Sequence, residues 1–179
     1  MNSSCPDARV NDLAALHDQA RSLLQQSPPA GLPPQAVAAA VEVLLEVATQ
    51  LGSLHYYLLR DRSGGWGAFE SEEILPEPWL QPLPGRWLAA YADLEQAIAL
   101  QDRANRGEPI RRSPADLLEI EEVEVLRVLW IGLGLTRASG LIFLDFPSGS
   151  SAPVTAISTQ ELKRQLAIAL RRPQSPPVA

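Results

Sequence analysis

Apolar residues three and four positions apart predict helices at both ends of the chain. The first pattern lies within residues 1–26, and a second runs over residues 35–51, where Gly52 follows as a left-handed C-cap. The last predicted helix begins at Ser158, with Glu161 three positions on in a capping box. Its apolar face consists of Leu162, Leu166, Ala169 and Leu170.

Short apolar and aromatic runs bounded by turn residues predict four strands. Residues 54–60 and 66–69 flank the turn cluster 61–65, which is typical of a β-hairpin. Residues 87–92 predict a third strand, although their alanines equally suit an early start of the next helix. Residues 141–146 are the most strand-like run of the chain and predict the fourth strand.

Two more helices are expected between the third and fourth strands. Asp93 caps the first of them, with Gln96 three positions on. Ser113 is a good N-cap, and acidic residues followed by an apolar second half predict one helix over residues 113–135. The alternation in residues 123–125 leaves a strand open there, but the capped start and the length favour a helix.

This order of elements predicts an α+β fold: a two-layer sandwich of a mainly antiparallel four-stranded sheet with helices packed on one face, plus N-terminal helices. A doubly wound sheet is the weaker alternative, because strands and helices do not alternate in the first half. Proline-rich segments suggest three parts. They are an N-terminal amphipathic arm with its linker (1–33), a single α+β domain (34–172) and a disordered tail (173–179).

Charge and composition exclude several classes of function. The chain has 179 residues, of which 15 are Lys or Arg and 21 are Asp or Glu, so its formal net charge is −6. An acidic chain whose only lysine is Lys163 is a poor ligand for a phosphate backbone, and we expect no nucleic-acid partner. No apolar run approaches the roughly 20 residues of a membrane span. Cys5 has no partner for a disulfide, and residues 1–10 lack the features of a secretory signal, so a cytoplasmic protein is expected.

Candidate catalytic residues are few. The two histidines, His17 and His55, show no metal-ligand spacing, so we expect no metal and no cofactor. His55 and Asp145 with Ser139 or Ser148 include the residue types of a hydrolytic triad, but no G-x-S-x-G elbow surrounds any serine. Asp145 ends a hydrophobic strand, where desolvation would raise its pKa unless a hydrogen bond offsets it.

An acidic, proline-rich loop at residues 70–86 is the better candidate for recognition. An aromatic residue held by prolines loses little entropy on binding, and tryptophan is a frequent hot-spot residue. The alternative is that Trp79 folds back as a lid on the core. The residues expected to contact a partner are Trp79, Leu80, Glu72, Glu73 and Glu77.

The segments LHYYLLRDRSGGW, RWLAAYADLEQAIAL and SGLIFLDFPSG together resemble small uncharacterised soluble proteins of cyanobacteria. The resemblance covers about residues 50–171, and none of the three segments is a catalytic motif. It implies a cytoplasmic setting linked to photosynthesis and no particular activity.

Two hypotheses of function follow. The first is a non-enzymatic protein-interaction or assembly module that uses the acidic, Trp-bearing surface to bind a protein partner, of which an arginine-rich one fits best. The alternative is a small-molecule-binding regulator or enzyme, with a pocket near His55, Asp145, Ser148 and Ser150 in the loop 147–151. The apolar half of the 113–135 helix suits either a homodimer interface or burial within one chain.

Overall fold

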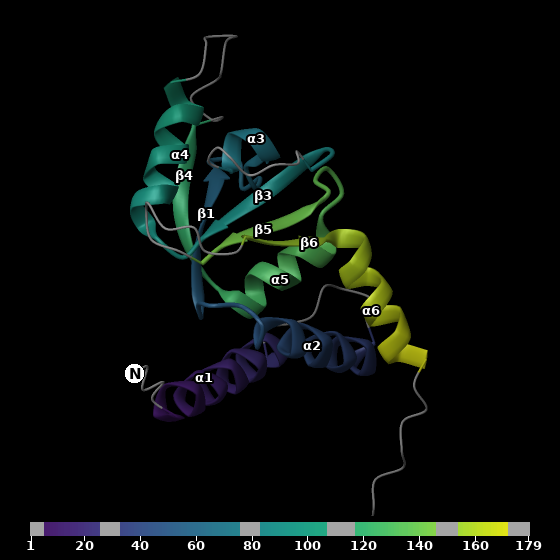
Figure 1. Cartoon of the computed structure of the whole chain (residues 1–179). Helices are drawn as coiled ribbons and strands as arrows, with labels where there is room; N and C mark the ends of the chain where they lie inside the picture. The colour runs from purple at the N-terminus through teal and green to yellow at the C-terminus, as the bar shows by residue number, and fades with distance from the viewer. Residues whose placement is uncertain (1–5, 26–32, 76–82, 107–116, 146–153, 172–179) are drawn as a thin grey trace, which may run out of the picture.

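The computed structural model describes residues 6–25, 33–75, 83–106, 117–145 and 154–171. Within these residues the fold is α+β, as expected, with helices on both sides of a mixed sheet (Figure 1). The helices are α1 (Pro6–Gln25), α2 (Pro34–Ala48), α3 (Ser71–Ile74), α4 (Leu94–Arg106), α5 (Val125–Gly134) and α6 (Thr159–Arg171). The strands are β1 (His55–Asp61), β2 (Ala68–Glu70), β3 (Arg86–Tyr91), β4 (Leu118–Glu124), β5 (Gly140–Leu144) and β6 (Val154–Ser158).

The strand order is β4-β1-β3-β5-β6, and β2 pairs with β3 outside this path. Strands β3 and β5 run parallel, whereas all the other pairs are antiparallel. The sheet is thus mainly antiparallel, as predicted, but it contains one parallel pair and, within the described residues, six strands instead of the predicted four. The parallel pair arises because the chain leaves β3, crosses through α4, β4 and α5, and returns beside β3 in the same direction.

The predicted β-hairpin forms only at its turn. Gly64 adopts φ +93°, a conformation that favours glycine, and its N–H donates to the Asp61 carbonyl at 3.0 Å. Beyond the isolated bridge between Arg60 and Trp66, the two segments diverge. Strand β2 then pairs with β3, and β1 takes β4 as its long neighbour instead.

The predicted helix over residues 113–135 was wrong in its first half. Residues 118–124 form β4, which pairs along its whole length with β1, from Leu118 opposite Asp61 to Glu124 opposite His55. The alternation of apolar and acidic residues prevails over the helix signal because β1 supplies backbone partners, and Arg60 of β1 and Arg62 of the turn after it pair with its glutamates. Residues 113–116, which carried that signal, lie outside the described residues.

Strand β6 was not predicted, because five uncharged residues between a serine-rich stretch and a helix give little pattern. It pairs antiparallel with β5. The approach is close at Gly140, where an added Cβ would lie 2.2 Å from the Ile157 carbonyl oxygen. The helix that follows begins as expected, since the Glu161 N–H donates to Ser158 Oγ at 3.1 Å.

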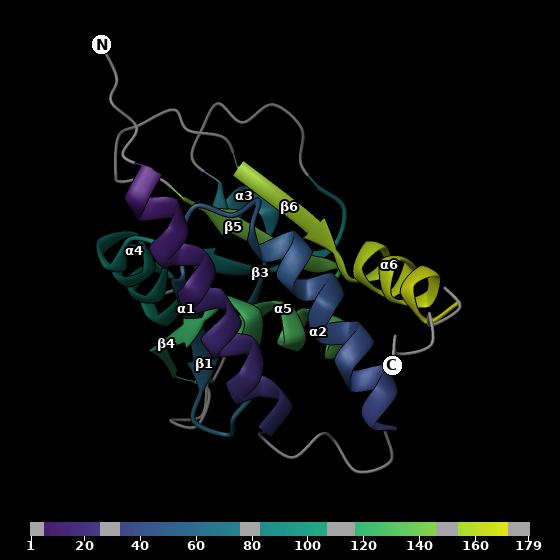
Figure 2. The same cartoon turned by 90° about the horizontal axis from the view of Figure 1, so that it is seen from below.

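Helices cover both faces of the sheet, so the prediction of helices on one face was also wrong. Side chains alternate along β3 and β5: Leu88 and Phe143 join a core with α1, α2, α5 and α6, while Trp87 and Ile142 join a second core with α3 and α4. Helix α5 lies against the sheet, and α1 and α2 pack beyond it (Figures 1 and 2). Burial on both sides explains why the central strands are continuous apolar runs.

The first helix packs on the rest of the fold. Leu16 and Ala20 of α1 are buried in the first core. Gln19 donates to the Leu54 carbonyl at 3.0 Å and accepts from the Leu126 N–H at 3.4 Å. The domain boundaries at 33/34 and 172/173 remain predictions. Among the described residues, no helix has both the length and the apolar character of a membrane span.

Candidate functional site

Asp145 lies in a hydrogen-bond network with Tyr56, not with His55. The Tyr56 hydroxyl donates to Asp145 Oδ1, and the Gly52 N–H donates to Asp145 Oδ2 at 3.2 Å. The Ser53 N–H in turn donates to the Tyr56 oxygen at 3.2 Å. Burial and the neighbouring Asp145 carboxylate together raise the pKa of Tyr56, so its hydroxyl stays protonated and continues to donate.

This network has a structural consequence. It fastens the segment after α2 to the end of β5, and every polar atom in it has a partner. His55 is exposed and, as the neighbour of Tyr56 on β1, points to the other side of the strand. Among the hydrogen bonds of the described residues, none joins the His55 side chain to Asp145. Ser148 and Ser150 lie outside the described residues, so the ligand site of the alternative hypothesis remains a prediction.

The other serine of the hypothetical triad holds two loops together. The Ser139 hydroxyl donates to the Pro84 carbonyl at 3.3 Å, and its N–H donates to the Arg86 carbonyl at 2.7 Å. Both bonds tie the start of β5 to the start of β3. The position therefore supports the parallel strand pair.

Two of the predicted partner-binding residues lie on the short helix α3. The Glu73 carboxylate accepts the N–H of Glu70 at 2.9 Å in a capping box, and Glu72 accepts the Ser71 hydroxyl at 3.2 Å. Both side chains are exposed. Glu77, Trp79 and Leu80 lie outside the described residues, and their role stays a prediction.

A hollow of about 630 Å³ lies where β1 and β4 meet the turn 61–65. Its lining mixes both charges: Arg60, Asp61, Arg62, Ser63, Gly64, Glu119, Ile120 and Glu121. We call the carboxylates of β4 at this end, Glu119 and Glu121, the acidic pair. Each of them holds an arginine of β1 or of the turn after it at 2.8 Å, Glu121 with Arg60 and Glu119 with Arg62.

The walls of this hollow are held by local contacts. Arg60 lies over the Trp66 ring, with its guanidinium carbon 5.1 Å from the ring centre, a cation–π geometry. Asp61 accepts the Ser63 hydroxyl at 2.6 Å and the Gly65 N–H at 2.8 Å. These hydrogen bonds, that of Ser63 first, lower the pKa of Asp61, so its carboxylate stays ionised.

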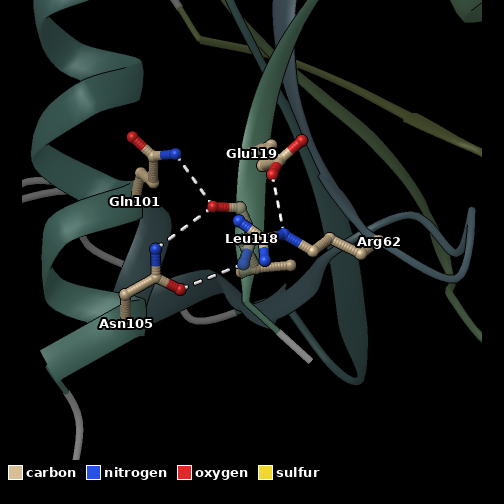
Figure 3. Close-up of polar contacts among 5 residues, drawn as sticks. All are labelled: Arg62, Gln101, Asn105, Leu118 and Glu119. Atoms are coloured by element: carbon tan, nitrogen blue, oxygen red, sulfur yellow. Dashed lines mark hydrogen bonds and ion pairs between the residues drawn. The ribbon is translucent and has the colours of Figure 1, made fainter. Parts of the chain in front are cut away.

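Helix α4 caps the outer edge of β4 beside the hollow (Figure 3). Asn105 makes a two-way contact with Leu118: its amide donates to the Leu118 carbonyl at 3.1 Å and its oxygen accepts the Leu118 N–H at 3.1 Å. Gln101 donates to the same carbonyl at 2.8 Å. Two side chains thus replace a neighbouring strand at the first residue of β4.

Sequence reasoning did not single out these residues, although a signal was present. Arg60 and Arg62 are two positions apart, as are Glu119 and Glu121, so in a strand each pair shares a face. Matched pairs of opposite charge at this spacing are typical of cross-strand partners. The α4 amides, Gln101 and Asn105, are four positions apart and therefore also share a face.

Within the described ranges, no three His, Cys, Asp or Glu side chains lie close enough together to hold a metal ion. Comparison with known proteins also gives no lead, since no family model, no curated protein and no solved structure matches the chain.

Proposed function

We propose that this protein is a non-catalytic interaction module of the cytoplasm that binds an arginine-bearing segment of another protein at the acidic pair and the hollow beside it. The observation that carries the proposal is that Glu119 and Glu121 already hold two guanidinium groups at 2.8 Å, in a hollow open to solvent. A partner's arginine would make the same contact.

Exchange of arginines at this site costs little free energy. The side chains of Arg62 and Glu119 are 54% and 60% exposed, and ion pairs of such exposure contribute about 0–1 kcal/mol. A partner that brings several arginines to the hollow can therefore displace Arg62. Asp61, whose lowered pKa keeps it ionised, adds a third carboxylate to the lining.

The remaining acidic residues of β4 lie on its other face. Glu122 and Glu124 alternate with the acidic pair along the strand, so their side chains are on the side of α4, and within the described part of the chain they form no ion pair. Glu72 and Glu73 lie exposed on α3. The loop with Glu77, Trp79 and Leu80 follows α3 directly in the sequence, so we propose it, with Glu72 and Glu73, as a second and separate contact region for the same partner.

The test is direct binding of a labelled peptide with arginine at every second position, measured by fluorescence anisotropy at low salt. We expect saturable binding that weakens as salt is added, because the attraction is between exposed charges. Glu119→Gln together with Glu121→Gln should weaken binding about tenfold, which corresponds to about 1.4 kcal/mol. The matched control is Glu161→Gln, which removes a carboxylate that pairs with Arg164 on α6.

Trp79→Ala tests this second contact region separately. Weaker binding with unchanged unfolding would support a role for the loop in recognition, whereas a loss of stability would favour the lid alternative. Equal affinities of the wild type, the double variant and the Glu161→Gln control would contradict the proposal.

A further inference from the structure

The other edge of the sheet, β6, is built without charge. Its side chains are those of Val154, Thr155, Ala156, Ile157 and Ser158. It pairs with β5 on one side, and among the described residues no strand pairs with its outer side. In Figure 2, β6 leads directly into α6 at the side of the sheet opposite β4.

The register shows which backbone groups of β6 point outward. The Thr159 N–H donates to the Ser139 carbonyl at 2.9 Å, one step beyond the pair of Gly140 and Ser158. Because hydrogen-bonded and non-hydrogen-bonded pairs alternate in an antiparallel ladder, Ile157 and Thr155 exchange bonds with β5. The N–H and C=O groups of Val154 and Ala156 and the N–H of Ser158 therefore face away from the sheet, whereas the Ser158 carbonyl, as that of the N-cap residue, is directed into the first turn of α6.

These outward groups are complementary to those of a second copy. If two β6 strands run antiparallel about a two-fold axis at Ala156, each Ala156 lies opposite its own copy and Val154 lies opposite Ser158. Every residue with outward groups then meets another such residue. The pairing brings no charged side chain of β6 into the interface, so it carries no penalty for desolvating a charge on the strand.

Strand β4 cannot pair with itself in this way. Its outward groups at Leu118 already bond to Asn105 and Gln101. By the same alternation the backbone N–H and C=O groups of Glu122 also face outward. If two β4 strands paired antiparallel about Glu122, two carboxylates would lie directly opposite each other, which is destabilising. Of these two edges, as far as the described residues define them, β6 is therefore the one that suits a second copy of this chain.

We propose that this protein forms a symmetric dimer in which the β6 strands of two copies pair antiparallel around Ala156 and join the two sheets into one. The two-fold axis runs normal to the sheet, so the α6 helices of both copies lie on the same face of the joined sheet. This assembly is independent of the arginine-binding surface at β4, on the opposite edge, and it would present that surface twice.

The test is sedimentation velocity of the full chain over a wide range of concentration. The wild type should show a concentration-dependent dimer. Ala156→Asp and Ala156→Lys should each weaken self-association at least tenfold, because like charges then lie directly opposite each other. An equimolar mixture of the two variants should restore a dimer, since a carboxylate then faces an ammonium group.

The controls separate this edge from the exposed apolar residues of α6. Ile168 and Leu170 are 45% and 50% exposed, and the double variant Ile168→Ser with Leu170→Ser should leave the dimer intact. The proposal is overturned if the wild type stays monomeric throughout, if the α6 variant alone abolishes the dimer, or if the mixture of charge variants fails to associate. Circular dichroism first shows that each charge variant is folded, so a mixture that then fails to associate counts against the strand pairing itself.

Discussion

Both β4 and β6 end the sheet, but they differ in what they present to a potential neighbour. Strand β4 carries four glutamates and has its first residue capped by two amides of α4, whereas β6 carries no charge and, in the described residues, no such cap. An unpaired strand edge is a template for pairing with another chain, and proteins block it with charges or cover it with a helix. The comparison indicates that charges and a helix block the β4 edge against strand pairing, whereas within the described residues nothing blocks the β6 edge.

The largest expected effect comes from Gly140→Ala, which disturbs the pairing of β6 with β5 where Gly140 lies opposite Ser158. The added methyl group would meet the Ile157 carbonyl at 2.2 Å and the Ser158 Cα at 2.7 Å. Backbone cannot move aside as a side chain does, so β6 must separate from β5, and we expect a loss of about 3 kcal/mol. Urea unfolding measures it. Gly134→Ala is the control, because nothing lies within 4 Å of the added group.

Asn105→Ala should have the next largest effect, because it uncaps β4. It leaves the Leu118 N–H without its partner next to a buried side chain, which costs about 2 kcal/mol. Gln101→Ala should cost less, since Asn105 still donates to the Leu118 carbonyl. Urea unfolding, with hydrogen exchange at the Leu118 amide, measures both. Equal losses for the two variants would argue against the capping role of the Asn105 oxygen.

Unfolding at alkaline pH tests how much two buried tyrosines in the centre of the sheet, Tyr56 and Tyr91, contribute to stability compared with the charged residues at its edges. Burial, reinforced by Asp145, raises the pKa of Tyr56 on β1; burial, partly opposed by the charge of Arg103, raises that of Tyr91 on β3 to about 12. The unfolded chain releases the two tyrosine protons near pH 10, whereas the folded chain still holds them. The stability that the two tyrosines contribute is therefore fully present below pH 10, and the free energy of unfolding falls as the pH rises above it.

The expected slope between pH 10 and 12 is about 1.4 kcal/mol per pH unit for each of the two tyrosines. Urea midpoints over this range measure it. Tyr91→Phe should halve the slope, while charge variants of either edge should leave it unchanged. A slope that Tyr91→Phe does not alter would show that other groups control the alkaline limit.

Glu119→Gln should have the smallest effect on stability. Its pair with Arg62 is exposed on both sides, so we expect a loss of a few tenths of a kcal/mol that disappears at about 0.5 M salt. Thermal unfolding at low and high salt is the measurement. A loss well above 1 kcal/mol would mean that this pair stabilises the fold, and arginine exchange at the hollow would then be costly.

Local patterns predicted the parts of this fold that depend on a few neighbouring residues. The Asp93 cap is confirmed, since Asp93 Oδ1 accepts the N–H groups of Glu95 and Gln96 at 2.8 and 3.2 Å. The Ser158 cap and the strand near residues 141–146 are confirmed as well. Each rests on contacts within three or four residues or on one unbroken apolar run, so its signal is complete in the sequence.

The errors concern elements whose partners are remote. The residues of β4 follow a helix-start signal in the sequence and show only a weak alternation of apolar and acidic side chains. Their partners are remote in sequence: Arg62 and Glu119, which form an ion pair, are 57 positions apart. The hollow follows the same logic, because its arginines and carboxylates come from two segments that only sheet pairing brings together. Likewise, Asp145 meets Tyr56, 89 positions away, and the adjacent His55 faces elsewhere.

Composition and local order in this chain thus already specify an acidic α+β protein, its helix starts and its most apolar strands. Which strand becomes the neighbour of which, and hence where the acidic pair and the uncharged edge lie, follows from packing of the complete chain. The reason is physical: a cap satisfies its donors within one turn of helix, whereas a strand satisfies its edge with whichever distant segment offers matching groups once both faces are buried.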